Sequence, residues 1–483
     1  MNDKETAHSE TLQTGIVVIG GGGGGLAAAV AASERGADVI LLEKRSTFGG
    51  NASSAGGIFA AESSAQERSK IDARRDDHFK VAMSHSHWKI DPRIIRAFID
   101  KSGNTIQWLE EKGLRFEAPQ FYPNLPRTIH LSQGHGAEIV NVLVKKCKDL
   151  GVRLFSDTSA KKILTNDKGN VVGVLGTTKE REFKVIAKSV IIATGGYAGN
   201  KELLKKYYPF YTQDLYSIGL PHMGEGLIMV IEIGAATEGL GILHLRGPYF
   251  RGSLEGVVAA MQPTTIWVNK KGERFADEGT TSYWPEAANA LNRQPDKICY
   301  ALFDEKINEM FIEEGVVQGY NRFRAQAKLT ELGRNLQLEV NKGGVKISNS
   351  LEEIAIWIGA APTVLKNTIG DYNSFCDQKH DKMFVKDPRF LLPLRTPPYY
   401  ALKCYQSFFG TIGGIKINHH MEVLNRQDNP IAGLYAAGND TGGWESDTYT
   451  LILPGTTFGF AINSGRIAGE NAANYISGKW KTR

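Results

Sequence analysis

The sequence predicts an α/β protein in which a second domain is inserted into a nucleotide-binding one. Six consecutive glycines at 20–25 follow an apolar, β-branched run at 15–19 and precede an alanine-rich segment at 26–32. A hairpin pattern later in the chain leads into another apolar strand at 185–193. Residues 248–395 then carry more charge and many aromatic side chains, which indicates an inserted α+β domain.

The glycine segment has the spacing of a dinucleotide-binding turn. Gly20, Gly22 and Gly25 fit the pattern G-x-G-x-x-G, which supplies a tight bend, close approach of backbone to a pyrophosphate, and close helix packing. A second apolar strand at 38–42 ends in Glu43, near the ~20-residue spacing at which an acid accepts a hydrogen bond from a ribose hydroxyl. The alternative is a flexible linker. The order of strand, turn, helix, strand and acid favours a Rossmann-like unit.

Composition excludes several other classes. The chain has 483 residues, 42% of them hydrophobic and 23% charged, and a net charge of +5. No dense run of basic residues occurs, so nucleic-acid binding is not expected. The four cysteines form no CxxC pattern, so we expect no disulfide, haem, iron–sulfur cluster or metal site. No run reaches the ~18 apolar residues of a membrane span, and no signal peptide is evident, so a cytoplasmic location is expected.

The expected organisation has three parts. Residues 1–14 are polar and predict a disordered leader. The nucleotide-binding domain is expected at 15–247 and 396–483, and the inserted domain at 248–395. A β-meander that returns to the nucleotide sheet and a closing helix at 457–475 complete this domain.

Nearly the whole chain resembles the flavoprotein superfamily that contains soluble fumarate reductases and 3-ketosteroid dehydrogenases. The motifs that carry the resemblance are, in chain order, Gly20–Glu43, Gly49-Gly50-Asn51, Ala193-Thr194-Gly195-Gly196, Asn269–Glu278, Gly433–Gly438, and Pro454-Gly455 with Gly465–Gly469. The resemblance implies FAD bound by a domain of the GR2 type with a β-meander, and a cap domain that closes over the flavin. Where other members link flavin to histidine, this chain has Gly50-Asn51, which implies noncovalent FAD.

The resemblance also implies which residues contact FAD. Gly20, Gly22 and Gly25 would lie at the pyrophosphate, Glu43 at the adenosine ribose, and Asn51 near the flavin. The further positions are Gly57, Ala193, Thr194, Gly195, Gly438, Asn439, Gly455, Thr456 and Thr457. Among these, Asn439 would contact the ribityl chain, where fumarate reductases usually carry glutamate. The amides that open the last helix would lie beside the flavin pyrimidine and stabilise negative charge there.

The shared reaction of the superfamily moves hydride between flavin N5 and a carbon β to a carbonyl, in either direction. Three residues that fumarate reductases use for this reaction are absent. Ser282 replaces the proton-relay arginine, Ile452 the carboxylate-binding arginine, and Gly410 a substrate histidine. Fumarate is therefore not the expected substrate.

Tyrosines occupy positions that are catalytic in ketosteroid dehydrogenases. By resemblance, Tyr283 is the base, Tyr122 supports it, and Tyr449 with the amide of Gly455 binds the substrate carbonyl. A phenol has an ordinary pKa of about 10, so it needs donors or a cation to act as a base and less help as an acid. Each tyrosine is equally compatible with a packed aromatic side chain. A ketosteroid-like or other cyclic enone is the favoured small-molecule substrate.

Two alternatives stay open. One is a reductase of an unsaturated carboxylic acid that uses His244, Arg246 or Arg251 in place of the missing arginines. The other is a hydratase or isomerase in which FAD is structural. No second glycine fingerprint with its own strand and acid occurs, so a separate electron donor or acceptor is expected.

Overall fold

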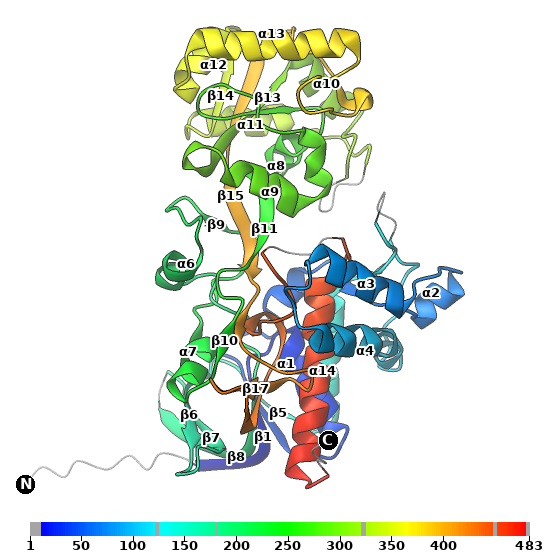
Figure 1. Ribbon diagram of the computed structural model, residues 1–483, viewed down its shortest axis with the longest axis vertical. Helices are drawn as coiled ribbons and strands as arrows, with labels where there is room; N and C mark the ends of the chain where they lie inside the picture. Colours follow the sequence, from blue (N-terminus) through cyan, green and yellow to red (C-terminus); the bar gives the residue numbers. More distant parts are fainter. Residues whose placement is uncertain (1–10, 121–124, 180, 320–324, 448–451, 480–483) are drawn as a thin grey trace, which may run out of the picture. The chain divides into compact units, whose positions relative to one another are not determined.

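The computed structural model describes residues 11–120, 125–179, 181–319, 325–447 and 452–479, which form two compact units (Figure 1). Unit 1 comprises residues up to 209, 219–244 and the chain from 410 onward. Unit 2 comprises 210–218 and 245–409, so it extends beyond the expected inserted domain on both sides. The expected leader is too long, because its last four residues, 11–14, belong to the first strand.

Unit 1 is organised around a mostly parallel sheet with strand order β17-β18-β8-β1-β2-β5. Its strands are β1 (Thr11–Ile19), β2 (Val39–Leu42), β5 (Arg153–Phe155), β8 (Glu182–Ile192), β17 (Glu422–Leu424) and β18 (Pro430–Ala436). The end of β1 pairs in parallel with both β2 and β8, and its residues from Ile16 to Ile19 are buried. Burial on both faces explains why β2 and the end of β1 are continuous apolar runs.

The expected β-meander is confirmed. Strands β6 (Ser159–Thr165) and β7 (Val171–Thr177) form an antiparallel hairpin, and β7 pairs antiparallel with β8. The fold class is therefore the one that the sequence predicts. The remaining short strands of this unit are β3 (Ile58–Phe59), β4 (Ile129–His130), β10 (Thr237–Glu238) and β16 (Gly414–Ile415).

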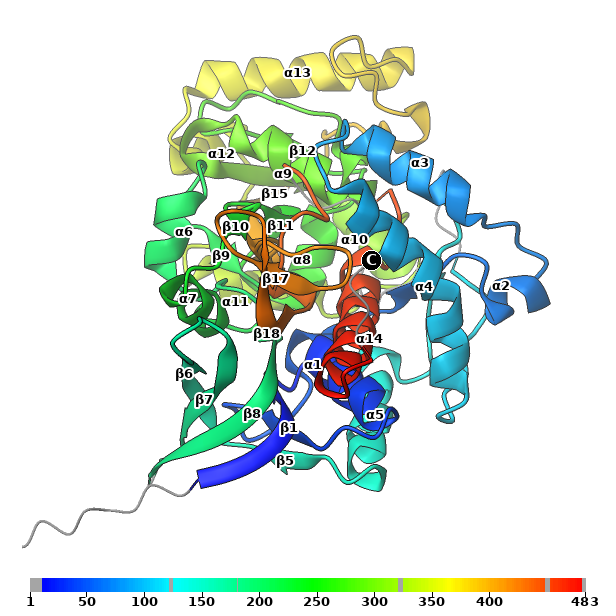
Figure 2. The same ribbon diagram turned by 60° about the horizontal axis from the view of Figure 1, so that its bottom comes forward.

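Two helices far apart in sequence pack along one another in unit 1, as Figure 2 shows: α1 (Gly23–Ser33) and α14 (Thr456–Ile476). A Cβ atom on Gly465 would lie 2.1 Å from the carbonyl oxygen of Gly24, so only glycine permits this approach. The other helices of the unit are α2 (Ser64–Arg68), α3 (Arg75–His85), α4 (Pro92–Glu110), α5 (His135–Asp149), α6 (Lys201–Tyr207) and α7 (Glu225–Glu232).

Unit 2 combines a sheet with helices, as expected for an α+β domain. The sheet contains β9 (Tyr216–Ser217), β11 (Leu243–Phe250), β12 (Ile266–Val268), β13 (Ile298–Asp304), β14 (Val345–Ser348) and β15 (Tyr399–Thr411). The helices are α8 (Leu254–Ala260), α9 (Trp284–Asn292), α10 (Glu305–Glu313), α11 (Leu332–Val340), α12 (Leu351–Ile358) and α13 (Pro362–Gln378). Every residue of strand β13 is buried and most of them belong to the hydrophobic core of the unit. Across the described part of both units, no helix has the length and apolar character needed to cross a membrane.

Candidate functional site

The glycine turn of unit 1 has the backbone geometry of a phosphate site. Gly20 has φ +102°, and a Cβ atom there would lie 2.2 Å from the carbonyl oxygen of Ala193. The N-cap of α1 is Gly22, and the first turn of the helix contains no acidic side chain and receives no side-chain cap. The first amides of a helix lack intrahelical acceptors and lie at its positive end. Those of α1 therefore suit an anionic group such as a pyrophosphate.

Glu43 lies beside this turn. Its Oε2 accepts a hydrogen bond from the backbone amide of Gly21 at 2.7 Å, and its Oε1 accepts one from the amide of Arg45 at 2.9 Å. The carboxylate is thus held at the end of β2 and fixes the glycine turn. The structure brings Glu43 to the position that the fingerprint predicts, and its contact with a ribose stays a prediction.

The loop that follows β8 is held by Asp440, a residue that sequence reasoning passed over. Asp440 belongs to the short 3-10 helix Gly438–Asp440 after β18. Its carboxylate accepts hydrogen bonds from the amides of Gly195 and Gly196 and from the hydroxyl of Thr194. Ala193 is bound in turn to β1, its amide donating to the carbonyl of Ile19 at 2.8 Å. The sequence does contain a signal for this residue, because an aspartate directly follows Asn439 at the end of an apolar strand.

Several predicted flavin residues lie on the same unit. Asn51 lies in the 3-10 helix Gly50–Ser54, and its Oδ1 accepts from the amide of Leu220 at 2.8 Å. The amide of Gly438 donates to the hydroxyl of Ser464 at 2.9 Å, which ties the last strand to α14. A Cβ atom on Gly57 would lie 2.3 Å from the carbonyl oxygen of His130. Packing within the protein is therefore a sufficient reason for glycine at this position.

The start of α14 provides a second set of uncapped amides. Gly455 is its N-cap, with φ +89°, and the first turn contains no acidic side chain. Thr456 donates its hydroxyl to the carbonyl of Leu453. Among the residues that the resemblance assigns to FAD, two have a buried oxygen atom without a hydrogen-bond partner in the described part of the chain: Asn439 at Oδ1 and Thr457 at Oγ1. Since buried polar atoms are normally paired, both oxygens are open to a hydrogen bond from a bound group, and their contact with FAD stays a prediction.

His222 also faces the loop after β8 and was not predicted. A Cβ atom on Gly195 would lie 3.0 Å from Nε2 of His222, so the imidazole covers this glycine closely. Its Nδ1 is buried without a hydrogen-bond partner in the described part of the chain. Burial, followed by the charge of Lys44, lowers the pKa of His222 to about 4, so its ring is neutral at physiological pH.

Unit 2 contains a cluster that combines one arginine with aromatic rings. Arg246 on β11 is 4% exposed, and its guanidinium carbon lies 4.7 Å from the ring centre of Trp284 and 5.1 Å from that of Phe409. The ring of Tyr249 lies 5.9 Å away. Burial lowers the pKa of Arg246 to about 9, and the group stays a cation at neutral pH. We call Arg246, Tyr249, Trp284 and Phe409 the arginine–aromatic cluster.

Tyr283 directly precedes Trp284, one member of this cluster, in the chain. It ends the 3-10 helix Glu278–Ser282 and is the N-cap of α9. Its amide donates to the carbonyl of Thr280 at 2.8 Å and its carbonyl accepts from Glu286 at 2.9 Å, which fixes the backbone. The side chain is half-buried. The neighbouring Ser282 is exposed and donates to Oε1 of Gln318.

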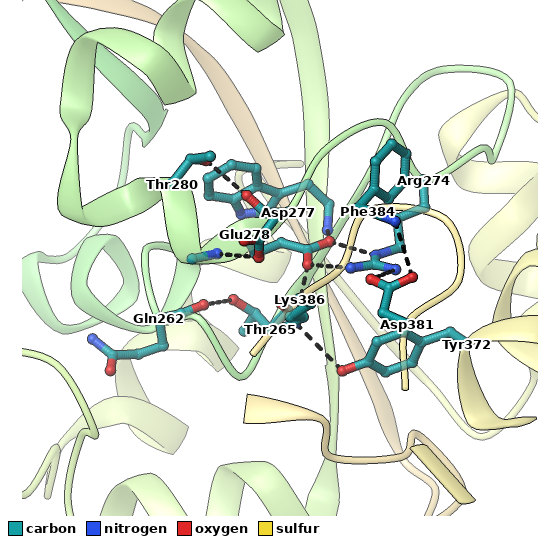
Figure 3. A network of polar contacts seen from close by, with 12 residues as sticks. Gln262, Thr265, Arg274, Asp277, Glu278, Thr280, Tyr372, Asp381, Phe384 and Lys386 are labelled. Carbon is teal, nitrogen blue, oxygen red and sulfur yellow. Dashed lines mark hydrogen bonds and ion pairs between the residues drawn. The ribbon is translucent and has the colours of Figure 1, made fainter. Parts of the chain in front are cut away.

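A buried ion network supports the segment that carries Tyr283 (Figure 3). Arg274 donates to both oxygens of Glu278 at 2.9 and 2.8 Å and to Asp381 at 2.8 Å. Lys386 donates to Glu278 at 3.0 Å. All four side chains are at most 3% exposed, so two cations and two carboxylates balance one another inside unit 2.

Other predicted residues have simpler outcomes. Tyr122 and Tyr449 lie outside the described residues. His244 is half-buried at the start of β11. Of the positions where fumarate reductases carry their substrate groups, Ile452 is half-buried, and a Cβ atom on Gly410 would lie 3.6 Å from Nδ2 of Asn439.

Comparison with known proteins agrees with the flavin interpretation. A family model described as an FAD binding domain matches residues 15–449. The chain is 33% identical over 434 residues to a vinyl phenol reductase of Lactiplantibacillus plantarum, which covers 86% of this chain and 88% of that protein. It is 30% identical over 432 residues to a probable fumarate reductase of Shewanella frigidimarina, with 87% of this chain and 68% of that protein covered.

A similar solved structure is that of the 3-ketosteroid delta1-dehydrogenase of Sterolibacterium denitrificans in complex with 1,4-androstadiene-3,17-dione. The TM-score is 0.80, with 95% of this chain and 99% of that chain covered. The sequence identity is 19%, so this likeness concerns the fold alone.

Proposed function

Since this chain belongs to the FAD binding domain family of flavoproteins, we propose that it reduces carbon–carbon double bonds in small, flat unsaturated substrates. It is an FAD-dependent oxidoreductase that acts on CH–CH bonds. The double bond would be conjugated to an aromatic ring or to a carboxylate. The observation that supports this substrate class is the arginine–aromatic cluster.

The residues of unit 1 fit FAD. The uncapped amides at the start of α1 would hold the pyrophosphate, and Glu43 would accept from the adenosine ribose. Asn439 and Thr457 each have a buried oxygen without a partner among the described residues, as expected for groups that bind the ribityl chain and the flavin ring. Asn51 stands where a linking histidine would be, so we propose noncovalent binding.

Bound FAD supplies the two-electron chemistry that adds hydrogen across a carbon–carbon double bond. The chain must then orient the substrate and deliver a proton. We assign proton delivery to Tyr283, because its backbone is fixed between two helical segments and its neighbour Trp284 belongs to the arginine–aromatic cluster. The uncapped amides of α14 would stabilise negative charge near the flavin.

The arginine–aromatic cluster suits a flat anionic or phenolic substrate. Aromatic side chains recognise an aryl ring by stacking. The N–H groups of a guanidinium match a carboxylate or phenolate oxygen, and a dry environment strengthens that interaction. Arg246 is nearly fully buried beside Trp284 and Phe409, so both kinds of recognition are present in one place.

This substrate class replaces the ketosteroid-like enone that the tyrosine pattern favours. Two relatives at or above 30% identity are named for vinyl phenol and fumarate, whereas the ketosteroid dehydrogenase shares only the fold. The expected alternative, a reductase of an unsaturated acid that uses Arg246, is therefore better supported. Fumarate itself stays disfavoured, because Ser282, Ile452 and Gly410 stand where the resemblance places a proton-relay arginine, a carboxylate-binding arginine and a substrate histidine.

The test is anaerobic reoxidation of the reduced flavoprotein. A stopped-flow instrument would follow the return of oxidised flavin absorbance after addition of 4-vinylphenol, cinnamate, fumarate or a 3-ketosteroid enone. We expect reoxidation by 4-vinylphenol or cinnamate and none by fumarate or the enone. An enone that alone reoxidises the flavin would contradict the proposal. A spectrum unchanged by every compound would indicate a structural flavin, as in a hydratase or isomerase.

Variants of two arginines sharpen this test. Arg246→Met is expected to raise KM by about 10- to 100-fold, from the loss of a charged hydrogen bond worth about 1.5–3 kcal/mol. Arg246→Lys retains the charge and is expected to recover part of the affinity. Arg389→Met is the matched control, because its side chain is 79% exposed and pairs with Asp387. An unchanged KM in Arg246→Met would remove the cluster from substrate binding.

A further inference from the structure

We propose that Asp440 lowers the reduction potential of the bound flavin by holding a buried negative charge within unit 1. The inference concerns FAD alone and does not depend on the substrate proposed above. It rests on where Asp440 lies, on what surrounds its carboxylate, and on which residue precedes it in the chain.

The carboxylate is enclosed by hydrogen-bond donors. Its Oδ1 accepts from the amide of Gly196 at 2.9 Å and its Oδ2 from the amide of Gly195 at 2.9 Å. The hydroxyl of Thr194 lies 3.0 Å from both oxygens. The residue is 1% exposed, so protein groups and not water solvate it.

This surrounding matches the ionised form. The amides of Gly195 and Gly196 can only donate, so each needs an acceptor oxygen, and an ionised carboxylate supplies acceptors on both sides. Burial raises the pKa of Asp440 above its ordinary value, and the hydrogen bonds from the amides of Gly196 and Gly195 limit this rise. A carboxylate that accepts hydrogen bonds from two backbone amides and a hydroxyl is a common way to keep a buried charge.

Both glycines that bind the carboxylate have backbone conformations that a side chain would strain. Gly195 has φ +88° and Gly196 φ +90°, and a Cβ atom on Gly196 would lie 2.2 Å from the hydroxyl oxygen of Thr411. The loop is thus shaped so that two successive amides point at one carboxylate. Glycine adopts these positive φ angles without strain, so two successive glycines permit the loop to present both amides to the carboxylate.

The charge lies next to the predicted ribityl contact. Asn439, which directly precedes Asp440, has its Oδ1 buried without a partner among the described residues. Reduction adds negative charge to a flavin, and a fixed negative charge nearby opposes that step. The flavin then becomes a stronger reductant.

The measurement is the midpoint potential of the flavin by spectroelectrochemistry. Asp440→Asn is expected to shift the potential to more positive values, because the variant removes the charge and nearly retains the shape. Asp440→Glu retains the charge and is expected to stay nearer the wild-type potential. Asp428→Asn is the matched control, because Asp428 is an exposed carboxylate of the same unit that pairs with Lys416.

Each outcome decides the proposal. A positive shift in Asp440→Asn with none in Asp428→Asn supports it, and a wild-type potential in Asp440→Asn overturns it. If Asp440→Asn does not retain FAD, the potential is measured in Asp440→Ser, whose smaller side chain leaves room for water among the same donors. Loss of FAD from both neutral variants would overturn the electrostatic role in favour of a purely structural clamp.

Discussion

At the scale of single residues, Glu278 has the most demanding environment in unit 2. Its carboxylate accepts from Arg274, from Lys386 and from the amide of Trp267 at 3.0 Å, and it is fully buried (Figure 3). Glu278→Ala leaves two buried cations without this partner. We expect the free energy of unfolding of unit 2 to fall by about 3–5 kcal/mol, measured by denaturant titration.

Two control experiments distinguish loss of the ion network from nonspecific destabilisation by a substitution. Glu314→Ala removes an exposed carboxylate from the same unit and is expected to change stability little. Adding Lys386→Met to Glu278→Ala removes one of the unbalanced cations, so the double variant should lose less than the sum of the single losses. Strict additivity of the two losses would contradict the coupling that the distances indicate.

The same network predicts how stability depends on pH. Burial acts to raise the pKa of Glu278, but the charges of Lys386 and Arg274 outweigh it and hold the pKa below its ordinary value. Burial likewise acts to raise the pKa of Asp381, but its hydrogen bond with Arg274 and that residue's charge hold the pKa below its ordinary value. A depressed carboxyl pKa stabilises the folded state above the unfolded pKa of about 4, and this stability is lost as the pH falls through the folded pKa.

Unfolding midpoints in urea between neutral pH and about pH 3 test this expectation. The wild type should lose stability steeply below about pH 4, whereas Glu278→Gln should start lower and show a shallower decline. Parallel profiles for the two proteins would show that other carboxyl groups control acid unfolding.

At the scale of elements, the loop from Asp381 to Lys386 delivers both partners of the ion network and contains a strained residue. Val385 has φ +56°, a conformation unfavourable for a β-branched side chain, and its side chain is 74% exposed. Val385→Gly should therefore relieve strain without loss of packing. We expect stabilisation of unit 2 by about 1 kcal/mol, seen as a higher melting temperature.

Met383 is the control for this loop. It is 57% exposed and does not have a positive φ, so Met383→Gly only adds freedom to the unfolded chain. We expect it to destabilise by about 0.5–1 kcal/mol. A loss of stability in Val385→Gly of the same size as in Met383→Gly would show that Val385 carries no strain.

At the contact between α1 and α14, an existing glycine is required because the two helix backbones approach closely. Gly465→Ala places a methyl group 2.1 Å from the carbonyl oxygen of Gly24, so the helices must separate, and FAD affinity should fall with stability. We expect unit 1 to lose about 1–3 kcal/mol. Gly370 in α13 is exposed, and a Cβ atom there has no neighbour within 4 Å, so Gly370→Ala should stabilise by about 1 kcal/mol. Equal effects of the two substitutions would contradict this packing argument.

Elements and local turns were predictable because their signals lie within a few residues. The glycine turn, the hairpin of β6 and β7, and Glu43 at the end of β2 each depend on adjacent sequence. The partners of Asp440 and Glu278 were not predictable, because Thr194 is 246 positions from Asp440 and Lys386 is 108 from Glu278. One sequence shows that a carboxylate exists but not which distant donors the fold brings to it.

At the scale of the whole molecule, the chain passes between the two units after residues 209, 218, 244 and 409, while the predicted FAD contacts all lie in unit 1. A ligand that binds only the folded state stabilises it, by about 2.7 kcal/mol at a concentration of 100 times Kd. Resistance to local unfolding should increase most in the segments that contact the ligand. Unit 1 is therefore expected to respond to FAD more strongly than the core of unit 2.

Hydrogen exchange of the apoprotein with and without FAD measures this difference segment by segment. We expect slower exchange on FAD binding in the turn from Gly20 to Gly25, in the loop from Ala193 to Gly196 and in the first turn of α14, whose amides contact the cofactor in our assignment. Strands β12 and β13 should exchange at unchanged rates, because they form the core of unit 2 and contain no predicted FAD contact. Equal protection throughout both units would show that the protein opens as one cooperative body, and that stabilisation by FAD extends to unit 2.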